Sequence, residues 1–326
     1  MTRRRAIHVV VAVLAGLTAS CVADPSGPYL GQTPPGTTAE LFAPGLLSTA
    51  LHDDGPAKLN ADGTEVYFRK WAVPHDIVGV MRLENGRWTA PELFKPMGRY
   101  VASAPVFAPD GLTRYYISRR PLEGDGEPAD YNIWSSEKVS DGWSEPVPLG
   151  PEVNSPEDEL LWSVSSRGTL YFQANRDDSH GGFDLYAQRS ADGVYLPPEN
   201  MGAPLNTEHT EAAPAVAPDE SFVVYCARGY PDGHGGLDLY VSFRQSDGSW
   251  SAGLNLGPGV NTPANEKFPS VTLDGRYLFF VGDGGAERSY VYSDMTYEEA
   301  MTRNLGPMNG RGDVYWVDTE VIHVLR

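Results

Sequence analysis

The chain has 326 residues, with 43 acidic and 25 basic side chains, so its formal net charge is −18 at pH 7. This charge argues against a nucleic acid as a partner, because binding a phosphate backbone requires a basic surface. A hydrophobic content of 41% supports a packed core and excludes wholesale disorder, and the two cysteines exclude a disulfide-rich scaffold. The 35 Gly, 27 Pro and 17 Tyr indicate many short strands joined by tight turns, not long helices.

Residues 1–20 have the pattern of a secretory signal peptide. Three arginines precede an apolar run, residues 6–19, which is shorter than the roughly 20 residues that a membrane-spanning helix needs. The following LTASC (residues 17–21) resembles the end of a bacterial lipoprotein signal. This resemblance implies cleavage before Cys21, acylation of Cys21, and a lipid anchor in the cell envelope, at the outer membrane facing the periplasm or the cell surface. The alternative is an ordinary signal peptide with an incidental cysteine.

Residues 21–37 are rich in Pro and Gly and show no hydrophobic periodicity. We expect them to form a tether between the lipid and the folded domain, with a reach of up to about 50 Å when extended. The second cysteine, Cys226, lies in an apolar strand pattern and is expected to be a buried, unreactive thiol.

From residue 38 onward the chain contains five repeats of about 50 residues. Each repeat has a strand, an Asp-Gly or related turn and an apolar-aromatic strand, at 56–68, 105–117, 162–172, 214–225 and 269–280. A longer loop then leads to a third strand, as at 132–139, 183–190, 237–244 and 313–321, and a fourth strand follows another short turn. Four antiparallel strands at this period are typical of β-propeller blades.

The predicted fold class is therefore all-β, a five-bladed β-propeller spanning residues 38–326. We expect blades at about 56–98, 103–155, 157–208, 211–262 and 266–326. The fifth repeat lacks a fourth strand, while residues 38–44 closely copy the fourth strand of the first repeat, residues 90–96. Residues 38–46 should therefore complete the last blade and close the ring, which leaves no open sheet edge. A six-bladed ring is the alternative, although no residues remain to build its sixth blade.

The Pro-Asp turn followed by an aromatic strand, as in PVFAPDGLTRYYI (105–117) and PAVAPDESFVVY (214–225), carries a family resemblance. It resembles the WD40-like propeller repeat of TolB-type proteins, which include periplasmic and lipoprotein members. The resemblance covers about residues 38–326 and implies a propeller. Many members of this group have no assigned activity, so the resemblance specifies the fold and not the function.

Function is expected on one face of the propeller. The turns between first and second strands and between third and fourth strands are minimal and lie on one face, here called the turn face. The second-to-third loops and the connections between blades are longer and lie on the opposite face, here called the loop face, where function usually resides.

Near the start of the first strand, four blades carry an acid: Asp53, Glu159, Glu211 and Glu266. Such a ring could bind calcium or another hard cation, but we favour the alternative that these carboxylates accept hydrogen bonds from loop amides.

Three arginines end the second strands of blades 2, 3 and 4: Arg119, Arg176 and Arg228. Neighbouring guanidinium groups could hold a carboxylate or a sulfate, with Trp162 beside them; alternatively they pair with the acids.

Two copied loops, SHGGFDLY (179–186) and GHGGLDLY (233–240), contain His180 and His234. These histidines could ligate a metal or act as an acid–base pair, but repeats also copy structural residues, which favours a structural role. The sequence contains no Gly-x-Ser-x-Gly, His-Glu-x-x-His or Cys-x-x-Cys pattern and no phosphate-binding glycine loop.

Together these features predict a lipid-anchored binding or scaffolding module of the cell envelope. Its partner would be an envelope protein or a glycan, bound on the loop face. The rival hypothesis is an extracellular carbohydrate-active enzyme, namely a glycosidase, a sialidase-like enzyme or a polysaccharide lyase. In that case His180, His234 and the arginines would form its active site. The absence of a catalytic motif favours the binding module, and no cofactor is expected apart from the calcium alternative.

Overall fold

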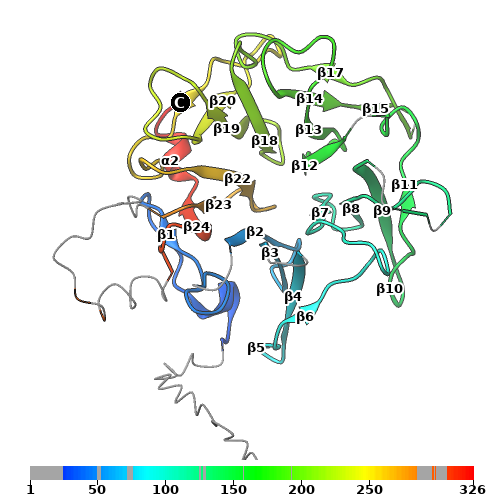
Figure 1. Cartoon of the computed structure of the whole chain (residues 1–326), viewed down its shortest axis with the longest axis vertical. Helices are drawn as coiled ribbons and strands as arrows, with labels where there is room; N and C mark the ends of the chain where they lie inside the picture. Colours follow the sequence, from blue (N-terminus) through cyan, green and yellow to red (C-terminus); the bar gives the residue numbers. More distant parts are fainter. Residues whose placement is uncertain are drawn as a thin grey trace, which may run out of the picture.

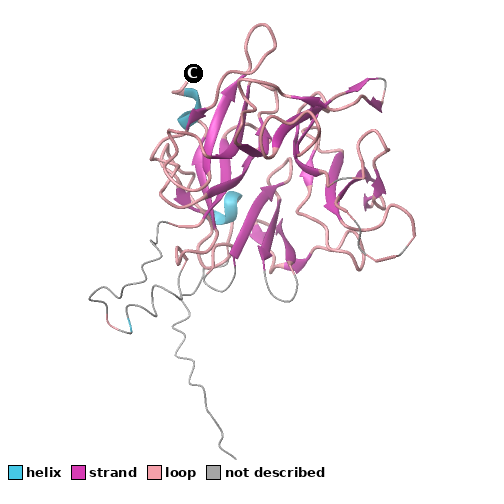
Figure 2. Ribbon diagram, turned by 45° about the horizontal axis from the view of Figure 1, so that its top comes forward, coloured by secondary structure: helices cyan, strands magenta, loops and turns pink. Residues whose placement is uncertain are grey.

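The computed structural model describes residues 25–49, 53–71, 76–124, 126–127, 130–156, 158–191, 193–284, 296, 298 and 307–326. Its strands form five antiparallel blades around a central axis (Figure 1), and nearly all of the described chain is strand or loop (Figure 2). The prediction of a five-bladed propeller is confirmed. The predicted signal peptide and Cys21 lie outside the described residues. Within the described ranges, no helix is long and apolar enough to cross a membrane.

The first three blades follow one another along the chain. Blade 1 contains β2 (Asp53–Leu59), β3 (Glu65–Trp71) and β4 (Ile77–Glu84), with β5 (Arg87–Trp88) and β6 (Glu92–Leu93) both paired to β4. Blade 2 contains β7 (Val106–Phe107), β8 (Thr113–Ser118) and β9 (Asn132–Val139), with β10 (Gly142–Trp143) and β11 (Val147–Pro148) both paired to β9. Blade 3 contains β12 (Leu160–Val164), β13 (Leu170–Ala174), β14 (Asp184–Gln188) and β17 (Glu199–Asn200), and a hairpin of β15 (Ser190–Ala191) and β16 (Val194–Tyr195) precedes β17.

The last two blades complete the ring. Blade 4 contains β18 (Thr210–Val216), β19 (Phe222–Arg228), β20 (Asp238–Phe243) and β21 (Leu254–Asn255). Blade 5 contains β22 (Glu266–Val271), β23 (Tyr277–Gly282), β24 (Asp313–Asp318) and β1 (Glu40–Leu41). Two helical segments have both ends within the described ranges, the 3-10 turn η1 (Pro28–Gly31) and the short helix α2 (Glu320–His323).

Closure of the ring by the N-terminal strand is confirmed. In β1, Glu40 pairs with Trp316 and Leu41 with Tyr315, so β1 is the outer strand of blade 5 beside β24. The next residue, Phe42, is fully buried. Its ring packs edge-on against Phe279 at a centroid distance of 4.9 Å and against Trp316 at 5.1 Å. The first and last strands of the propeller therefore share one blade.

The structure corrects the extent of the expected tether, because residues 25–37 pack on the turn face of blades 1 and 5. The Trp88 indole donates to the Gly27 carbonyl oxygen at 2.8 Å, beside the Asn85-Gly86 turn of blade 1. The Tyr29 ring meets Tyr277 edge-on at 5.2 Å, beside the first turn of blade 5. Of the expected tether, only residues 21–24 lie outside the described residues.

The inner strands, β2, β7, β12, β18 and β22, line the axis (Figure 1). The hydrophobic core is divided into clusters between neighbouring blades. Cys226 is buried in one of these clusters, and burial raises the pKa of its thiol to about 11. Four inner strands carry a β-bulge within a few residues of their start. A bulge bends the strand and redirects its side chains, and these bulges lie near the loop-face end of the inner strands.

Candidate functional site

Three of the predicted acids, Glu159, Glu211 and Glu266, are buried where the connections between blades meet the inner strands. Glu211 and Glu266 each accept one N–H and one O–H hydrogen bond from the threonine four residues earlier; Thr207 Oγ1, for example, donates to Glu211 Oε1 at 2.6 Å. Ser155 does the same for Glu159. In blade 1, Thr49 donates the corresponding hydrogen bonds to the Asp54 carboxylate. The side chain of the predicted Asp53 lies outside the described residues. Each acid therefore fastens its own loop. Among the described residues, no group of three His, Cys, Asp or Glu side chains could hold a metal ion.

These acids belong to a longer repeated pattern that our sequence analysis did not identify. The pattern Gly-x-x-x-Asn-Ser/Thr-x-x-x-Glu occurs at 150–159, 202–211 and 257–266. Its asparagine bonds both backbone groups of one residue in the third strand of the preceding blade; Asn206, for example, accepts from Leu185 N and donates to Leu185 O, each at 2.9 Å. The pattern therefore joins each connection to the preceding blade.

The two histidine loops belong to the same blade-to-blade contact. Gly182 N donates to the His209 carbonyl oxygen at 2.7 Å, and Gly236 N donates to that of Ala264 at 2.8 Å, in each case across to the next blade. His180 Nδ1 lies 3.1 Å from the buried Asp184. His234 Nδ1 lies 4.0 Å from Asp238, whose carboxylate accepts backbone N–H groups of the same loop. These hydrogen bonds hold each histidine loop in place and join it to the next blade.

A pH dependence of stability follows from the buried acids. Burial raises the pKa of Glu159 and of Glu266 from 4.5 to about 7. The folded state therefore holds these protons to a higher pH than the unfolded chain does. The resulting stabilisation is complete below about pH 4.5 and is lost as the pH rises through 7.

We therefore expect the free energy of unfolding to fall between pH 5 and pH 7, with Glu266 contributing about 2 kcal/mol of that fall. Urea unfolding of Glu266→Gln at both pH values should show a flatter dependence than the wild type. The matched control is Glu145→Gln, at an exposed position, which should keep the wild-type slope. Equal slopes in all three proteins would contradict the assignment.

A large hollow lies at the loop-face end of the axis and has a volume of about 730 Å³. We call it the mouth cavity; its walls come from the inner strands of blades 1, 3 and 5 and from the second strands and loops of blades 1 and 2. Blade 2 departs from the acid pattern at this point, because Ala102 stands where the other blades carry an acid, and Ser103 and Ala104 complete a wall of small side chains. The cavity therefore lies where alanine replaces the repeated acid.

The cavity wall is basic in a strongly acidic protein. Of the described residues that line it, four are basic, Lys58, Arg69, Arg99 and Arg119, and one, Asp76, is acidic and paired with Arg69. Lys58 Nζ donates to the Trp162 carbonyl oxygen at 3.2 Å. Burial lowers the pKa of Lys58 to about 7, so a substantial fraction of this amine is neutral at neutral pH. A site with this charge attracts anions.

Aromatic side chains form a row along one wall of the mouth cavity. Phe268 stacks on Trp162 with ring centroids 5.2 Å apart and planes 13° apart, and it lies 5.5 Å from the ring of Trp71. Phe268 sits in a β-bulge with φ of 56°, a left-handed conformation that costs roughly 1–3 kcal/mol for such a residue. The equivalent bulge residue of blade 4, Ala213, has φ of 54°. The fold therefore requires the bulge but does not require an aromatic side chain there.

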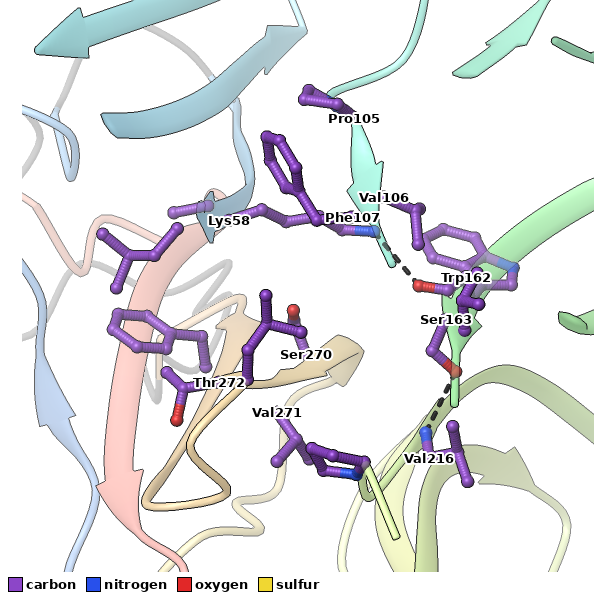
Figure 3. Close-up of a pocket in the computed structure, with 16 residues that line it drawn as sticks. Lys58, Pro105, Val106, Phe107, Trp162, Ser163, Val216, Ser270, Val271 and Thr272 are labelled. Carbon is purple, nitrogen blue, oxygen red and sulfur yellow. Dashed lines mark hydrogen bonds between the residues drawn. The ribbon is translucent and has the colours of Figure 1, made fainter. Parts of the chain in front are cut away.

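Below the mouth cavity, Lys58 and Trp162 also line a smaller cavity of about 50 Å³ on the axis (Figure 3). Residues from all five inner strands surround it, and Ser163 Oγ accepts from Val216 N at 3.0 Å across two blades. The Lys58–Trp162 contact therefore forms the floor of the mouth cavity and separates it from this smaller cavity.

The structure separates the predicted site residues into two groups. Arg119 and Trp162 line the mouth cavity, whereas Arg176 lies 3.5 Å from Glu159 and lines a smaller hollow between blades 2 and 3. Arg228 is exposed at the end of β19. Lys58, Arg69, Trp71 and Phe268 were not predicted from the sequence; Lys58 comes from β2, Arg69 and Trp71 from β3, and Phe268 from β22. Ala102, at the position where other blades have an acid, was the sequence signal of this interruption.

No family model matches the chain, and no curated protein sequence matches it. Solved structures resemble it in arrangement. One, assigned as a TolB from Agrobacterium tumefaciens, has a TM-score of 0.47 and 14% identity over 82% of this chain and 90% of its own. An alpha-L-arabinofuranosidase from Lactobacillus brevis has a TM-score of 0.48 and 14% identity, over 83% of this chain and 91% of its own. The catalytic domain of a Coprinopsis cinerea GH62 alpha-L-arabinofuranosidase has a TM-score of 0.47 and 10% identity, over 87% and 97%. At these values the similarities carry no argument about activity.

Proposed function

We propose that this protein is a binding module of the TolB-like repeat class, anchored in the cell envelope through Cys21, and that its partner binds in the mouth cavity. The observation that carries the proposal is a concave, basic and aromatic site of about 730 Å³ on the loop face of a protein with a net charge of −18. Cavities of roughly 300–1,000 Å³ with a few placed polar groups are typical of ligand sites.

The rival hypothesis is a carbohydrate-active enzyme, namely a glycosidase, a sialidase-like enzyme or a polysaccharide lyase. The first of these, a glycosidase, requires two carboxyl groups facing one bond of the substrate. Among the described residues that line the mouth cavity, Asp76 is the one carboxylate, and it is paired with Arg69. His180 and His234 belong to the blade-to-blade loops described above. Binding without turnover is therefore the function that this site supports best.

A thermal-shift screen of the purified protein against acidic glycans, neutral glycans and envelope peptides tests the proposal. A ligand at 100 times its dissociation constant adds about 2.7 kcal/mol to the stability of the folded state. We expect a ligand that stabilises the wild type and Arg228→Ala, and that fails to stabilise Arg119→Ala. Arg228→Ala is the matched control, because Arg228 ends the corresponding strand of blade 4 and does not line the cavity. Equal stabilisation of both variants would place binding elsewhere, and release of product from a glycan would favour the enzyme.

A further inference from the structure

The shape of the mouth cavity limits the class of ligand. A protein–protein interface of standard size buries about 800 Å² on each partner and is broad. The mouth cavity is instead a hollow of about 730 Å³ at the end of the axis, with small residues of blade 2 on one side and aromatic rings on the other. This volume suits one to three rings of a small ligand better than the surface of a folded protein.

The aromatic row supplies a surface for a ring with an apolar face. Trp71, Phe268 and Trp162 follow one another at centroid distances of 5.5 and 5.2 Å, and all three are only partly buried. The left-handed backbone of Phe268 holds its ring in this row, whereas Ala213 occupies the equivalent bulge of blade 4. The aromatic side chain at this position is thus an addition to the repeat, and it faces the cavity. Sugar rings present C–H groups on one face that pack against aromatic rings in this way.

The cations stand beside the same aromatic rings. Lys58 Nζ lies 6.0 Å from the centroid of the Trp162 ring, at the cavity floor, and the Arg69 guanidinium lies 5.4 Å from that of Trp71. On the other side of the cavity the Arg119 guanidinium lies 5.5 Å from the Tyr131 ring centroid. Cations in a partly dehydrated site bind a carboxylate through charge-assisted hydrogen bonds. A ligand ring on the aromatic row would therefore place an attached anionic group near Lys58.

We infer that the ligand of the mouth cavity is an acidic sugar, whose ring packs on Trp71, Phe268 and Trp162 and whose anionic group is bound at the floor by Lys58. This inference rests on the proposed function and gives it a ligand class. The anionic group can be a carboxylate or a phosphate, since Lys58 acts as a point charge for either.

Binding of an anion at Lys58 is linked to a proton. Because burial lowers the pKa of Lys58 to about 7, an anion that binds beside it raises that pKa and draws a proton from solution. The other charged groups facing the same cavity are the Arg69–Asp76 pair of blade 1 and Arg99 and Arg119 of blade 2. Arginines stay charged between pH 7 and 9. Glu159 and Glu266, which precede the lining residues Leu160 and Phe268, also titrate near pH 7, so the loss of the pH dependence in Lys58→Arg is what assigns it to Lys58.

Isothermal titration of the purified protein tests the inference, with oligosaccharides of galacturonate, glucuronate and N-acetylmuramate as carboxylate probes. The phosphate probe is galactose 6-phosphate, and galactotriose is the neutral probe. We expect at least one acidic probe to bind at least tenfold more tightly than the neutral one, with an affinity that falls up to tenfold for each pH unit above 7. Trp71→Ala and Lys58→Met should each weaken this binding about tenfold or more, and Lys58→Arg should retain binding and lose the pH dependence. Circular dichroism melting checks that each variant folds, and Arg228→Ala should bind as the wild type does.

Three outcomes would overturn the inference. The first outcome is that neutral and acidic sugars bind with equal affinity, or that Trp71→Ala and Lys58→Met bind acidic sugars as the wild type does. Either result would contradict the contacts assigned to Trp71 and Lys58. A peptide that binds the wild type but not Arg119→Ala would overturn the acidic sugar and leave the proposed function standing. No binding by any probe to folded wild-type protein would overturn the ligand class, and the thermal-shift screen would then decide the proposed function separately.

Discussion

Phe42→Ala should lower the free energy of unfolding by about 3–5 kcal/mol, the range for removing a fully buried phenylalanine ring. The Phe42 side chain is fully buried between Phe279 and Trp316, next to the strand that closes the ring. Loss of the ring leaves a cavity in blade 5, where the first and last strands of the propeller meet. The substitution therefore weakens the closure of the ring of blades as well as the local packing. Equilibrium unfolding in urea, followed by tryptophan fluorescence, measures the effect.

The matched control is Leu93→Ala in β6, the outer strand of blade 1 and the sequence counterpart of Leu41 in β1. The Leu93 side chain is 56% exposed, so its truncation should change the free energy of unfolding by less than about 0.5 kcal/mol. A loss below about 1 kcal/mol for Phe42→Ala would show that β1 contributes little to the stability of the ring.

Gly235→Ala should destabilise the fold by at least about 3 kcal/mol, through a clash between blades 4 and 5. A Cβ atom at this position would lie 2.1 Å from the Ala264 carbonyl oxygen and 2.6 Å from that of Thr262. Both are backbone atoms of the next connection, where Thr262 also bonds Glu266, so neither can move without breaking that loop. The melting temperature and the urea midpoint of the variant should both fall.

Gly36→Ala provides the comparison, because a Cβ atom there meets no atom within 4 Å. It should be close to neutral in the same measurements. The equivalent substitution in blade 3, Gly181→Ala, would place a Cβ atom 2.1 Å from the His209 carbonyl oxygen and should repeat the effect of Gly235→Ala. Wild-type stability in both loop variants would exclude the blade-to-blade contact that we describe.

The fold could be predicted because each blade repeats the same local signals. A turn with a left-handed residue, such as Gly63 or Gly275, sits between strands of matching apolar pattern, and this combination specifies a hairpin wherever it occurs. The N-terminal strand could be placed in the last blade because it copies the outer strand of the first. The packing of residues 25–37 could not be predicted, since Pro- and Gly-rich segments carry no periodicity that distinguishes a tether from an ordered strap.

The site could be predicted only in part, because its residues do not share a repeat position. Arg119 was identified from its repeated position at the end of a second strand, Trp162 was named as a further contact on the loop face, and the structure places both in the mouth cavity. Lys58 and Phe268 come from inner strands, where a lysine or an aromatic ring at the axis cannot be distinguished from one at the surface without the bulge geometry. For the repeated acids the sequence favoured hydrogen bonds from loop amides over a ring of cation ligands, and Glu159, Glu211 and Glu266 each accept such a bond from the Ser or Thr four residues earlier.

The strap of residues 25–37 also sets how the propeller would stand on a membrane. Its N-terminal end, Pro25, lies on the turn face. Pro25 is four residues after the proposed acylation site, Cys21, so the two are separated by at most about 14 Å. With Cys21 acylated as proposed, the turn face would lie toward the lipid and the mouth cavity would open away from it, on the far side of the disc. A propeller held in this orientation would take its ligand from the aqueous compartment or from the opposing layer of the envelope, and not from the membrane that anchors it.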